Sequence, residues 1–289
     1  MRPGLTTAPF ITSLRVLQLF VWCSLPLLPL FASVQAQTSA QASAEAATLL
    51  QQSLAAQIHG AAVTDVVATG VITRQHLGTV ETGTASLSAV GGGATQAVFD
   101  LPSGKVTETW SLSNNQAIIS GTGPKGSSTQ LAGGSILMPS PTWFAPILHP
   151  AFAHGPAVTV FLKGQEKRNG VNVQHVIAWQ TPAQDSSVPA PILRQQTQSD
   201  IYLDPMTLLP VSMIFEVRPY NPAGATKPLS IRARPAPEEV RYSDYQTVQG
   251  RRVPFNISAY LGRTKLFEIQ LSSVVFNTGI VISSSANGN

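Results

Sequence analysis

Side chains that could carry out chemistry are few in this chain, and their spacing assembles no catalytic or metal-binding set. The five histidines are His59, His76, His149, His154 and His175. His149 and His154 are five residues apart, which on a helix is a rotation of about 140°, so both rings could not face one ion. In a loop they could, but no carboxylate lies near them and the chain has no H-E-x-x-H motif. We therefore expect no metal site.

The carboxylates and glycines also lack the spacing of an active site. Acidic residues are scattered, and no spacing isolates an acid–base pair among Asp100, Glu108, Asp200, Asp204, Glu216, Glu238, Glu239 and Asp244. Gly121, Gly123 and Gly126 match a dinucleotide fingerprint, but Pro124 interrupts it and no helix-forming run follows. No G-x-S-x-G nucleophile motif is present. The sequence predicts no enzyme and no cofactor.

Large aromatic residues are the remaining candidates. Trp143 and Phe144 lie in the apolar run PTWFAPILHPAF (141–152), where Pro146 and Pro150 limit any helix to short turns. One interpretation is that aromatic residues line a cavity under a curved sheet and bind an apolar ligand. The alternative is ordinary core packing. The candidate ligand-binding residues, in a cavity or its lid, are Trp143, Phe144, Trp179, Phe215 and Phe255.

These side chains would be positioned mainly by strands. Alternating or β-branched runs predict strands at 66–73, 158–163, 171–179, 211–217, 255–261 and 266–271. Asn169-Gly170 predicts a hairpin because both residues accept a positive φ. The clearest helix runs from Ala44 to Ile58, with Leu50, Leu54 and Ile58 on one stripe. Short spacing with turn signals predicts an antiparallel sheet in one domain. Proline-rich stretches at 182–191 and 218–237 predict loops.

Composition argues against a nucleic-acid partner and against cysteine chemistry. Only 11% of the 289 residues are charged, and basic residues are directly adjacent only at Lys167-Arg168 and Arg251-Arg252. Arg232 and Arg234 form a further close pair. Nucleic-acid binding needs basic residues clustered on one face, so we expect no nucleic-acid partner. The single cysteine, Cys23, lies in a segment that we expect to be removed, which leaves no disulfide and no thiolate chemistry.

The first 36 residues have the pattern of a secretory signal. Arg2 and Arg15 precede an apolar run over 16–31, and Val34-x-Ala36 is a cleavage site. A membrane anchor is the alternative, but the run is shorter than the ~20 residues of a spanning helix. We predict a signal peptide at 1–36, a flexible leader at 37–43, one β domain at 44–283 and a disordered tail at 284–289.

The arrangement resembles the periplasmic lipoprotein-carrier (LolA/LolB-like) superfamily. The resemblance is carried by TLLQQSLAAQI (48–58), the TGVIT strand (69–73), YLDPMTLLPVSMIFEV (202–217) and VRYSDYQTVQGRRVPFNISAY (240–260). It implies an incomplete antiparallel barrel whose helices close an apolar cavity, and hence a carrier of acyl chains or other hydrophobic ligands. Arg74 is the candidate counterpart of the carriers' cavity arginine and stays unassigned.

Together these observations predict an exported, mainly β protein. A single curved antiparallel sheet would form an incomplete barrel, with an N-terminal helix and a short helical lid over its concave face, Trp143 or Phe144 pointing inward. The expected function is binding of a hydrophobic or lipid-type ligand in the cell envelope. The alternative is a structural or protein-interaction module with a filled interior, and an enzyme on envelope polymers comes third. We expect a monomer with a lipid or an envelope protein as partner.

Overall fold

A computed structural model describes residues 28–60, 62–76, 78–91, 94–111, 116–123, 126–132, 143–149, 151–152, 158–181, 190–191, 194, 198–217 and 236–282. The chain divides into two compact units, residues 1–40 and 41–289, each considered by itself. In the first unit, the described residues 28–40 are helical and form the start of α1 (Leu28–Gln57). No helix in the described ranges is both long and apolar enough to cross a membrane.

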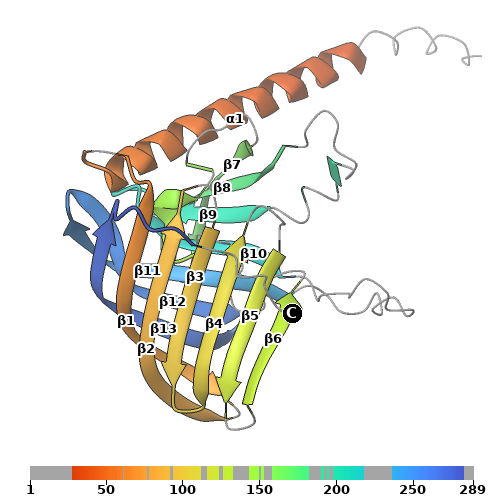
Figure 1. Ribbon diagram of the computed structural model, residues 1–289. Helices are drawn as coiled ribbons and strands as arrows, with labels where there is room; N and C mark the ends of the chain where they lie inside the picture. The colour runs from red at the N-terminus through yellow and green to blue at the C-terminus, as the bar shows by residue number, and fades with distance from the viewer. Residues whose placement is uncertain are drawn as a thin grey trace, which may run out of the picture. The chain divides into compact units, whose positions relative to one another are not determined.

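The second unit is built on one antiparallel sheet, and the described residues form thirteen strands of it (Figure 1). They are β1 (Asp65–His76), β2 (Thr79–Val90), β3 (Ala94–Leu101), β4 (Gly104–Ser111), β5 (Gln116–Gly123), β6 (Gly126–Ala132), β7 (Val158–Arg168), β8 (Val171–Gln180), β9 (Ser199–Leu203), β10 (Pro210–Val217), β11 (Ala236–Val248), β12 (Arg251–Leu261) and β13 (Thr264–Phe276).

The order of these strands is a meander joined in the middle. It runs β6-β5-β4-β3-β2-β1-β13-β12-β11-β10-β9-β8-β7, so every neighbouring pair except β1 and β13 is consecutive in the chain. The two edges, β6 and β7, are also consecutive in sequence. The connection between the two open edges therefore contains the apolar run that the sequence predicts as a lid. The incomplete barrel with one N-terminal helix is confirmed.

Ring distances show how strongly the sheet curves. Phe99 on β3 and Phe267 on β13 are three strands apart in the order, which is about 14 Å in a flat sheet, yet their ring centroids are 6.2 Å apart. The curved inner face carries the core, with fully buried Ile72, Leu87 and Ile257 among its members. The opposite face carries most of the charged side chains described below.

The predicted turns have the expected geometry. Asn169 (φ 49°) and Gly170 (φ 84°) form the turn between β7 and β8, which confirms the Asn-Gly hairpin. The Asp204 carboxylate accepts hydrogen bonds from the backbone N–H groups of Met206 (3.0 Å) and Thr207 (2.7 Å), as expected for an Asx-turn between β9 and β10.

The helix differs from its prediction in both start and packing. It begins at Leu28 rather than at Ala44, so residues 37–43, expected as a leader, are helical. The reason is composition, because the added residues are rich in alanine and glutamine, which favour helix. The buried stripe within the second unit is Ala46, Leu50, Ser53 and Gln57, whereas Leu54 and Ile58 are only half-buried.

Two expected loops lie mainly outside the described residues. Residues 182–189 and 218–235 are not described, and Ala236 and Pro237 at the end of the second loop begin β11. The tail at 284–289 and the cleavage site lie outside the residues whose side chains are described, and both remain predictions.

Candidate functional site

The interior of the curved sheet is filled by residues 143–152, which we call the aromatic segment (150 is not described). Trp143, Phe144 and Phe152 are fully buried in it. The Trp143 ring meets the Phe267 ring of β13 edge-on at 5.4 Å and the Phe144 ring at 5.6 Å. Aromatic pairs prefer such edge-to-face contacts. Trp143 and Phe144 thus point inward, as the sequence predicts.

The proline residues give this segment its local form. A single 3₁₀ turn, η2 (Pro146–Leu148), forms where Pro146 occupies the first turn, and no side chain caps its N-terminus. Its backbone bonds are internal, from Leu148 N to Ala145 O, His149 N to Pro146 O and Phe152 N to His149 O. The short helical lid is confirmed as one turn.

Two side chains on the sheet are the polar contacts of the aromatic segment among the described residues. The Tyr242 hydroxyl on β11 donates to the carbonyl oxygen of Trp143 at 2.7 Å. Ser199 Oγ on β9 lies 3.5 Å from His149 Nε2. The buried Trp143 Nε1 has no hydrogen-bond partner there. The segment is therefore held by packing and a few side-chain bonds rather than by strand pairing.

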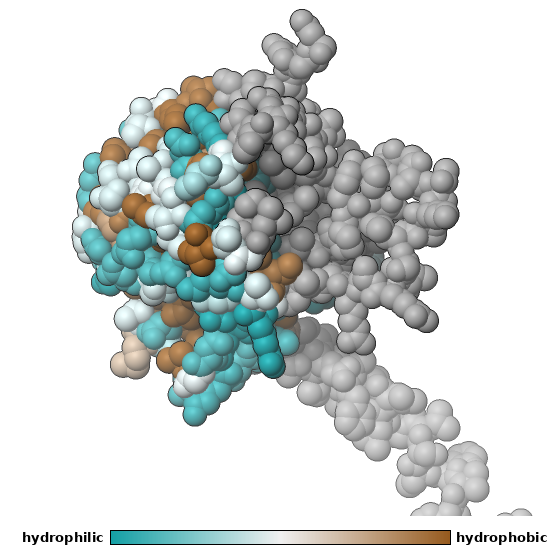
Figure 2. All heavy atoms as spheres, turned by 90° about the horizontal axis from the view of Figure 1, so that it is seen from below, coloured by the Kyte–Doolittle hydropathy of each residue, from teal (hydrophilic) through white to brown (hydrophobic). Residues whose placement is uncertain are grey.

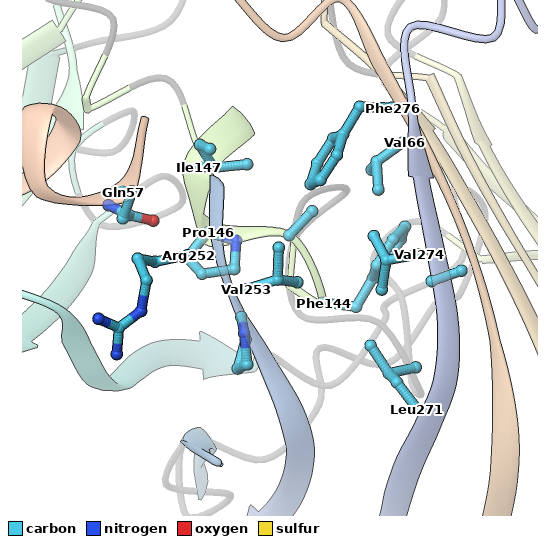
Figure 3. Close-up of a pocket in the computed structure, with 13 residues that line it drawn as sticks. Gln57, Val66, Phe144, Pro146, Ile147, Arg252, Val253, Leu271, Val274 and Phe276 are labelled. Atoms are coloured by element: carbon cyan, nitrogen blue, oxygen red, sulfur yellow. The ribbon is translucent and has the colours of Figure 1, made fainter. Parts of the chain in front are cut away.

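A small apolar cavity remains beside the aromatic segment. Its volume is about 10 Å³, which is room for about one water molecule. Figure 3 shows Val66, Leu271 and Val274 around it with Phe144 and Pro146, while Gln57 and Arg252 lie together on the other side. This cavity is too small for an acyl chain while the aromatic segment occupies the interior.

The five candidate ligand-binding residues do not all meet. Trp143, Phe144, Phe215 and Phe255 belong to the same buried core. Trp179 on β8 is outside that core and half-buried, and the Arg194 guanidinium lies 4.1 Å from the centre of its ring. It shares the outer side of β8 with His175 and Ile177, because side chains two residues apart point the same way.

Sequence analysis missed a pair of acids inside the sheet. Glu108 on β4 and Glu238 on β11 are both fully buried. Six strand spacings separate β4 from β11, about 29 Å in a flat sheet, yet the charge of Glu108 acts on Glu238. The sheet's curvature must therefore bring the two carboxyl groups towards each other across the interior. The Glu108 side chain therefore points into the interior of the sheet.

The surroundings of Glu238 disfavour its charged form. Burial, and then the nearby charge of Glu108, raise the pKa of Glu238 to about 8. Neither of its carboxylate oxygens has a hydrogen-bond partner among the described residues. Its cross-strand neighbour is the buried Phe215. Glu238 is therefore an unpaired acid in apolar surroundings.

His149 is a second buried titratable group. Burial lowers its pKa to about 4, so its ring is neutral at neutral pH. Nδ1 accepts a hydrogen bond from Ala151 N at 3.2 Å, and the ring lies 6.4 Å from that of Phe215. His154, considered with it as a metal ligand, lies outside the described residues.

Charges on the outer face of the sheet are paired. Glu239 on β11 contacts Arg168 at 3.0 Å and Arg241 at 2.9 Å. Although burial opposes it, hydrogen bonding and attraction from these arginines lower the pKa of Glu239. His175 is buried on this face between Glu166 (3.3 Å) and Asp200 (3.7 Å). It therefore belongs to this charged layer of the outer face.

The outer face also has an open groove of about 350 Å³. Part of it is lined by Arg241, Asn256, Ser258, Tyr260 and Lys265. The Asn256 side-chain amide donates to Glu268 Oε1 at 2.9 Å. On the face seen in Figure 2, hydrophobic residues form several small groups among hydrophilic ones. The coloured residues in that view form no single broad apolar patch of the kind that marks a docking surface.

Two further expectations concern arginine and metals. Arg74, the unassigned counterpart of a cavity arginine, pairs with Glu81 at 2.5 Å and donates to Ser103 Oγ at 3.1 Å. These contacts join the first two hairpins of the sheet.

In the part of the chain that the structure describes, no group of three or more His, Cys, Asp or Glu residues is placed to hold a metal ion.

The fold and the site define a class of protein: an open antiparallel sheet whose interior is filled by the connection between its two edges. Among similar solved structures is a DUF1329 family protein from Desulfovibrio piger ATCC 29098, 12% identical, TM-score 0.48, with 83% of this chain and 95% of that chain covered. Another is a putative outer membrane lipoprotein-sorting protein domain from Vibrio parahaemolyticus, 14% identical, TM-score 0.48, with the same coverage, 83% and 95%.

A LolA superfamily protein from Nitrosomonas europaea is also similar, at 12% identity and TM-score 0.43, with 80% of this chain and 93% of that chain covered. That description names the superfamily that the sequence resembles. At these identities and scores, the matches carry no statement about ligand or activity. No family model matches the chain, and no curated protein matches it.

Proposed function

We propose that this protein binds a hydrophobic, lipid-type ligand inside its curved sheet, and that the ligand displaces the aromatic segment. The observation that carries this proposal is how the segment is held. Its side chains fill the interior, while Tyr242 and Ser199 are its polar contacts on the sheet among the described residues. The segment can therefore leave without breaking any pairing between strands.

In such an exchange, the apolar contacts that the aromatic segment loses are replaced by contacts of the ligand. Burying one large apolar side chain is worth about 1.5–3 kcal/mol, so an interior emptied into water would be costly. An acyl chain that enters as Trp143, Phe144 and Phe152 leave would replace their contacts with Ile72, Leu87 and the rest of the apolar wall. The aromatic segment would then act as a gate, and Trp143, Phe144, Phe215 and Phe255 as wall or gate residues.

The place of action in this proposal is the cell envelope. The secretory pattern of residues 1–36 supports export. The core residues in the described part of the chain begin at Ala46, so cleavage after Ala36 would remove none of them. The exported protein would begin at Gln37 and contain no thiol.

A filled interior supports a second candidate, a structural or protein-interaction module of the envelope. The specific observation is the cavity of about 10 Å³, which is what a permanently closed core would contain. An enzyme on envelope polymers has less support. Glu108 and Glu238 are both fully buried, and a polymer needs an open cleft to reach an acid pair.

Binding of a fluorescent fatty-acid probe separates the two candidates. The ligand-binding proposal predicts saturable binding to the wild type and tighter binding to Trp143→Ala, because the probe no longer has to displace the indole. Met206→Ala, at an 89% exposed turn position, is the matched control and should bind like the wild type. If neither the wild type nor Trp143→Ala binds the probe saturably, the proposal is wrong and the structural module remains.

A further inference from the structure

We propose that the interior site selects amphiphiles with a cationic amine head, and that Glu238, assisted by Glu108, receives the ammonium group. This inference rests on the proposed function and names the chemical class of its ligand. It starts from an acid that no described residue neutralises. Glu238 is fully buried, and both of its oxygens lack a hydrogen-bond partner among the described residues.

The two acids come from opposite walls of one interior. Glu238 shares the inner side of β11 with the core residues Val240 and Tyr242, and Glu108 pairs in the ladder with the fully buried Ala97. A head group between the walls would therefore meet carboxylates from two directions. Its alkyl chain would lie along the apolar surface that the aromatic segment now covers.

No described group facing this interior supplies a positive charge to Glu238. Glu108 faces it from β4, Tyr242 lies on β11 itself, and His149 belongs to the aromatic segment next to Phe215. The first is an acid, and the other two are neutral at neutral pH because burial raises the pKa of Tyr242 and lowers that of His149. We infer that a bound molecule supplies the cation that the described residues do not.

The apolar surroundings favour an amine over a metal ion or an anion. Calcium needs six to eight oxygen ligands and magnesium near-octahedral ones, and no described metal-binding cluster exists here. An anionic head would be a like charge beside these two acids and would oppose ionisation of Glu238. A protonated amine offers up to three N–H donors on one centre. The ammonium group can therefore pair with the carboxylate of Glu238, while the alkyl chain of the ligand packs on the apolar wall.

Binding should release a proton. Without ligand, Glu238 is largely protonated at neutral pH because its pKa is raised to about 8. An ammonium group favours the carboxylate form, so Glu238 loses its proton when the amine binds. The amine keeps its own proton, and no other bond is made or broken. Affinity for the amine should therefore rise with pH up to about 8.

Calorimetry of the full chain with three probes of equal chain length tests this inference: dodecylamine, dodecanol and dodecanoic acid. We expect the wild type to bind the amine roughly tenfold or more tightly than the alcohol, since hydrogen bonds between charged groups are the strong ones. Titration in two buffers of different ionisation enthalpy should show a proton released at pH 7. Glu238→Gln should lose both the preference and the release, and Asp244→Asn, an exposed acid of the same strand, should keep both.

The outcomes distinguish this inference from the proposed function. If all three probes bind the wild type equally, or if Glu238→Gln keeps the amine preference, the inference is wrong and ligand binding stands. If the protein takes up calcium alone and discriminates no amine, the site is a cation site and the inference is likewise wrong. If no probe binds, both proposals fail. A circular dichroism spectrum and melting curve of Glu238→Gln establish that the variant is folded.

Discussion

Two neighbouring glutamates on β11 show how differently the two faces of this sheet treat the same side chain. Glu239 faces outward and lies 3.0 Å from Arg168 and 2.9 Å from Arg241, which lower its pKa. Glu238 faces inward, has no hydrogen-bond partner among the described residues, and has its pKa raised to about 8 by burial and by Glu108. The outer charges are satisfied within the chain, whereas no described residue satisfies the inner acid.

This difference separates structural charge from functional charge. The outer pairs connect strands: Arg168 extends from β7 to β11, and Arg74 and Glu81 join β1 to β2. Their role in holding strands together explains their presence. A buried acid without a partner among the described residues costs stability, which is the reason that we propose a ligand at this position. The predictions below test that contrast between faces.

The largest effect should come from emptying the interior. Trp143→Ala removes a fully buried ring and should lower the free energy of unfolding by about 3–5 kcal/mol. Trp179→Ala, the matched change on the outer side, removes a half-buried ring under Arg194 and should cost far less. Urea denaturation of both variants measures the difference. Equal losses would contradict the assignment of these two tryptophans to different faces.

The two glutamates should give opposite responses to pH. Between its ordinary pKa of 4.5 and about 8, Glu238 holds in the native state a proton that the unfolded chain has lost. The free energy of unfolding should therefore fall as pH rises through this window, by at most about 1.4 kcal/mol per pH unit. Glu238→Gln should remove this fall. Denaturation at several values between pH 5 and 8 measures it.

Glu239→Gln is the control for that experiment. Because the pKa of Glu239 is lowered, its stabilisation is present above the ordinary pKa and is lost only as pH falls through the lowered value. The Glu239→Gln variant should lose stability at pH 7 and keep the fall between pH 5 and 8. The contrast between faces breaks down if Glu238→Gln and Glu239→Gln change the pH profile in the same direction.

The smallest effect concerns the bond that joins the aromatic segment to the sheet. Tyr242→Phe removes the 2.7 Å hydrogen bond to Trp143 O and should cost about 0.5–1.5 kcal/mol. It should also bring the segment closer to release, and so tighten binding of a fatty-acid probe. Tyr245→Phe, which removes a bond of equal length to Pro210 O, should lower stability similarly without changing probe binding. Equal probe affinities for the two variants would contradict a gating role for Tyr242.

The sequence predicted those parts of the fold whose side chains alternate strongly. Strands β8, β10 and β12 place apolar residues at most alternate positions, and the turns before β8 and β12 carry glycine at positive φ, Gly170 and Gly250. Strand β2 was not predicted individually. Its inner face uses Ala85, Leu87 and Ala89 among threonines and serines, so its alternation in hydrophobicity is weak.

Burial of the aromatic segment could be predicted from its composition, because a run this apolar would be costly to expose to water. The acid pair could not, because Glu108 and Glu238 are far apart in sequence and only the closure of β1 onto β13 brings their strands round one interior. Both were visible as scattered carboxylates. Their common face depends on register and curvature, which no local spacing encodes.

Displacement of the aromatic segment is the central claim, and quenching of Trp143 fluorescence tests it most directly. In a full chain with Trp22, Trp110 and Trp179 replaced by phenylalanine, emission comes from Trp143 alone. Because Trp143 is fully buried, acrylamide should quench it weakly without ligand. Quenching should increase saturably as dodecylamine is added, in step with binding. Saturation of the protein with ligand while Trp143 stays as protected as before would contradict displacement.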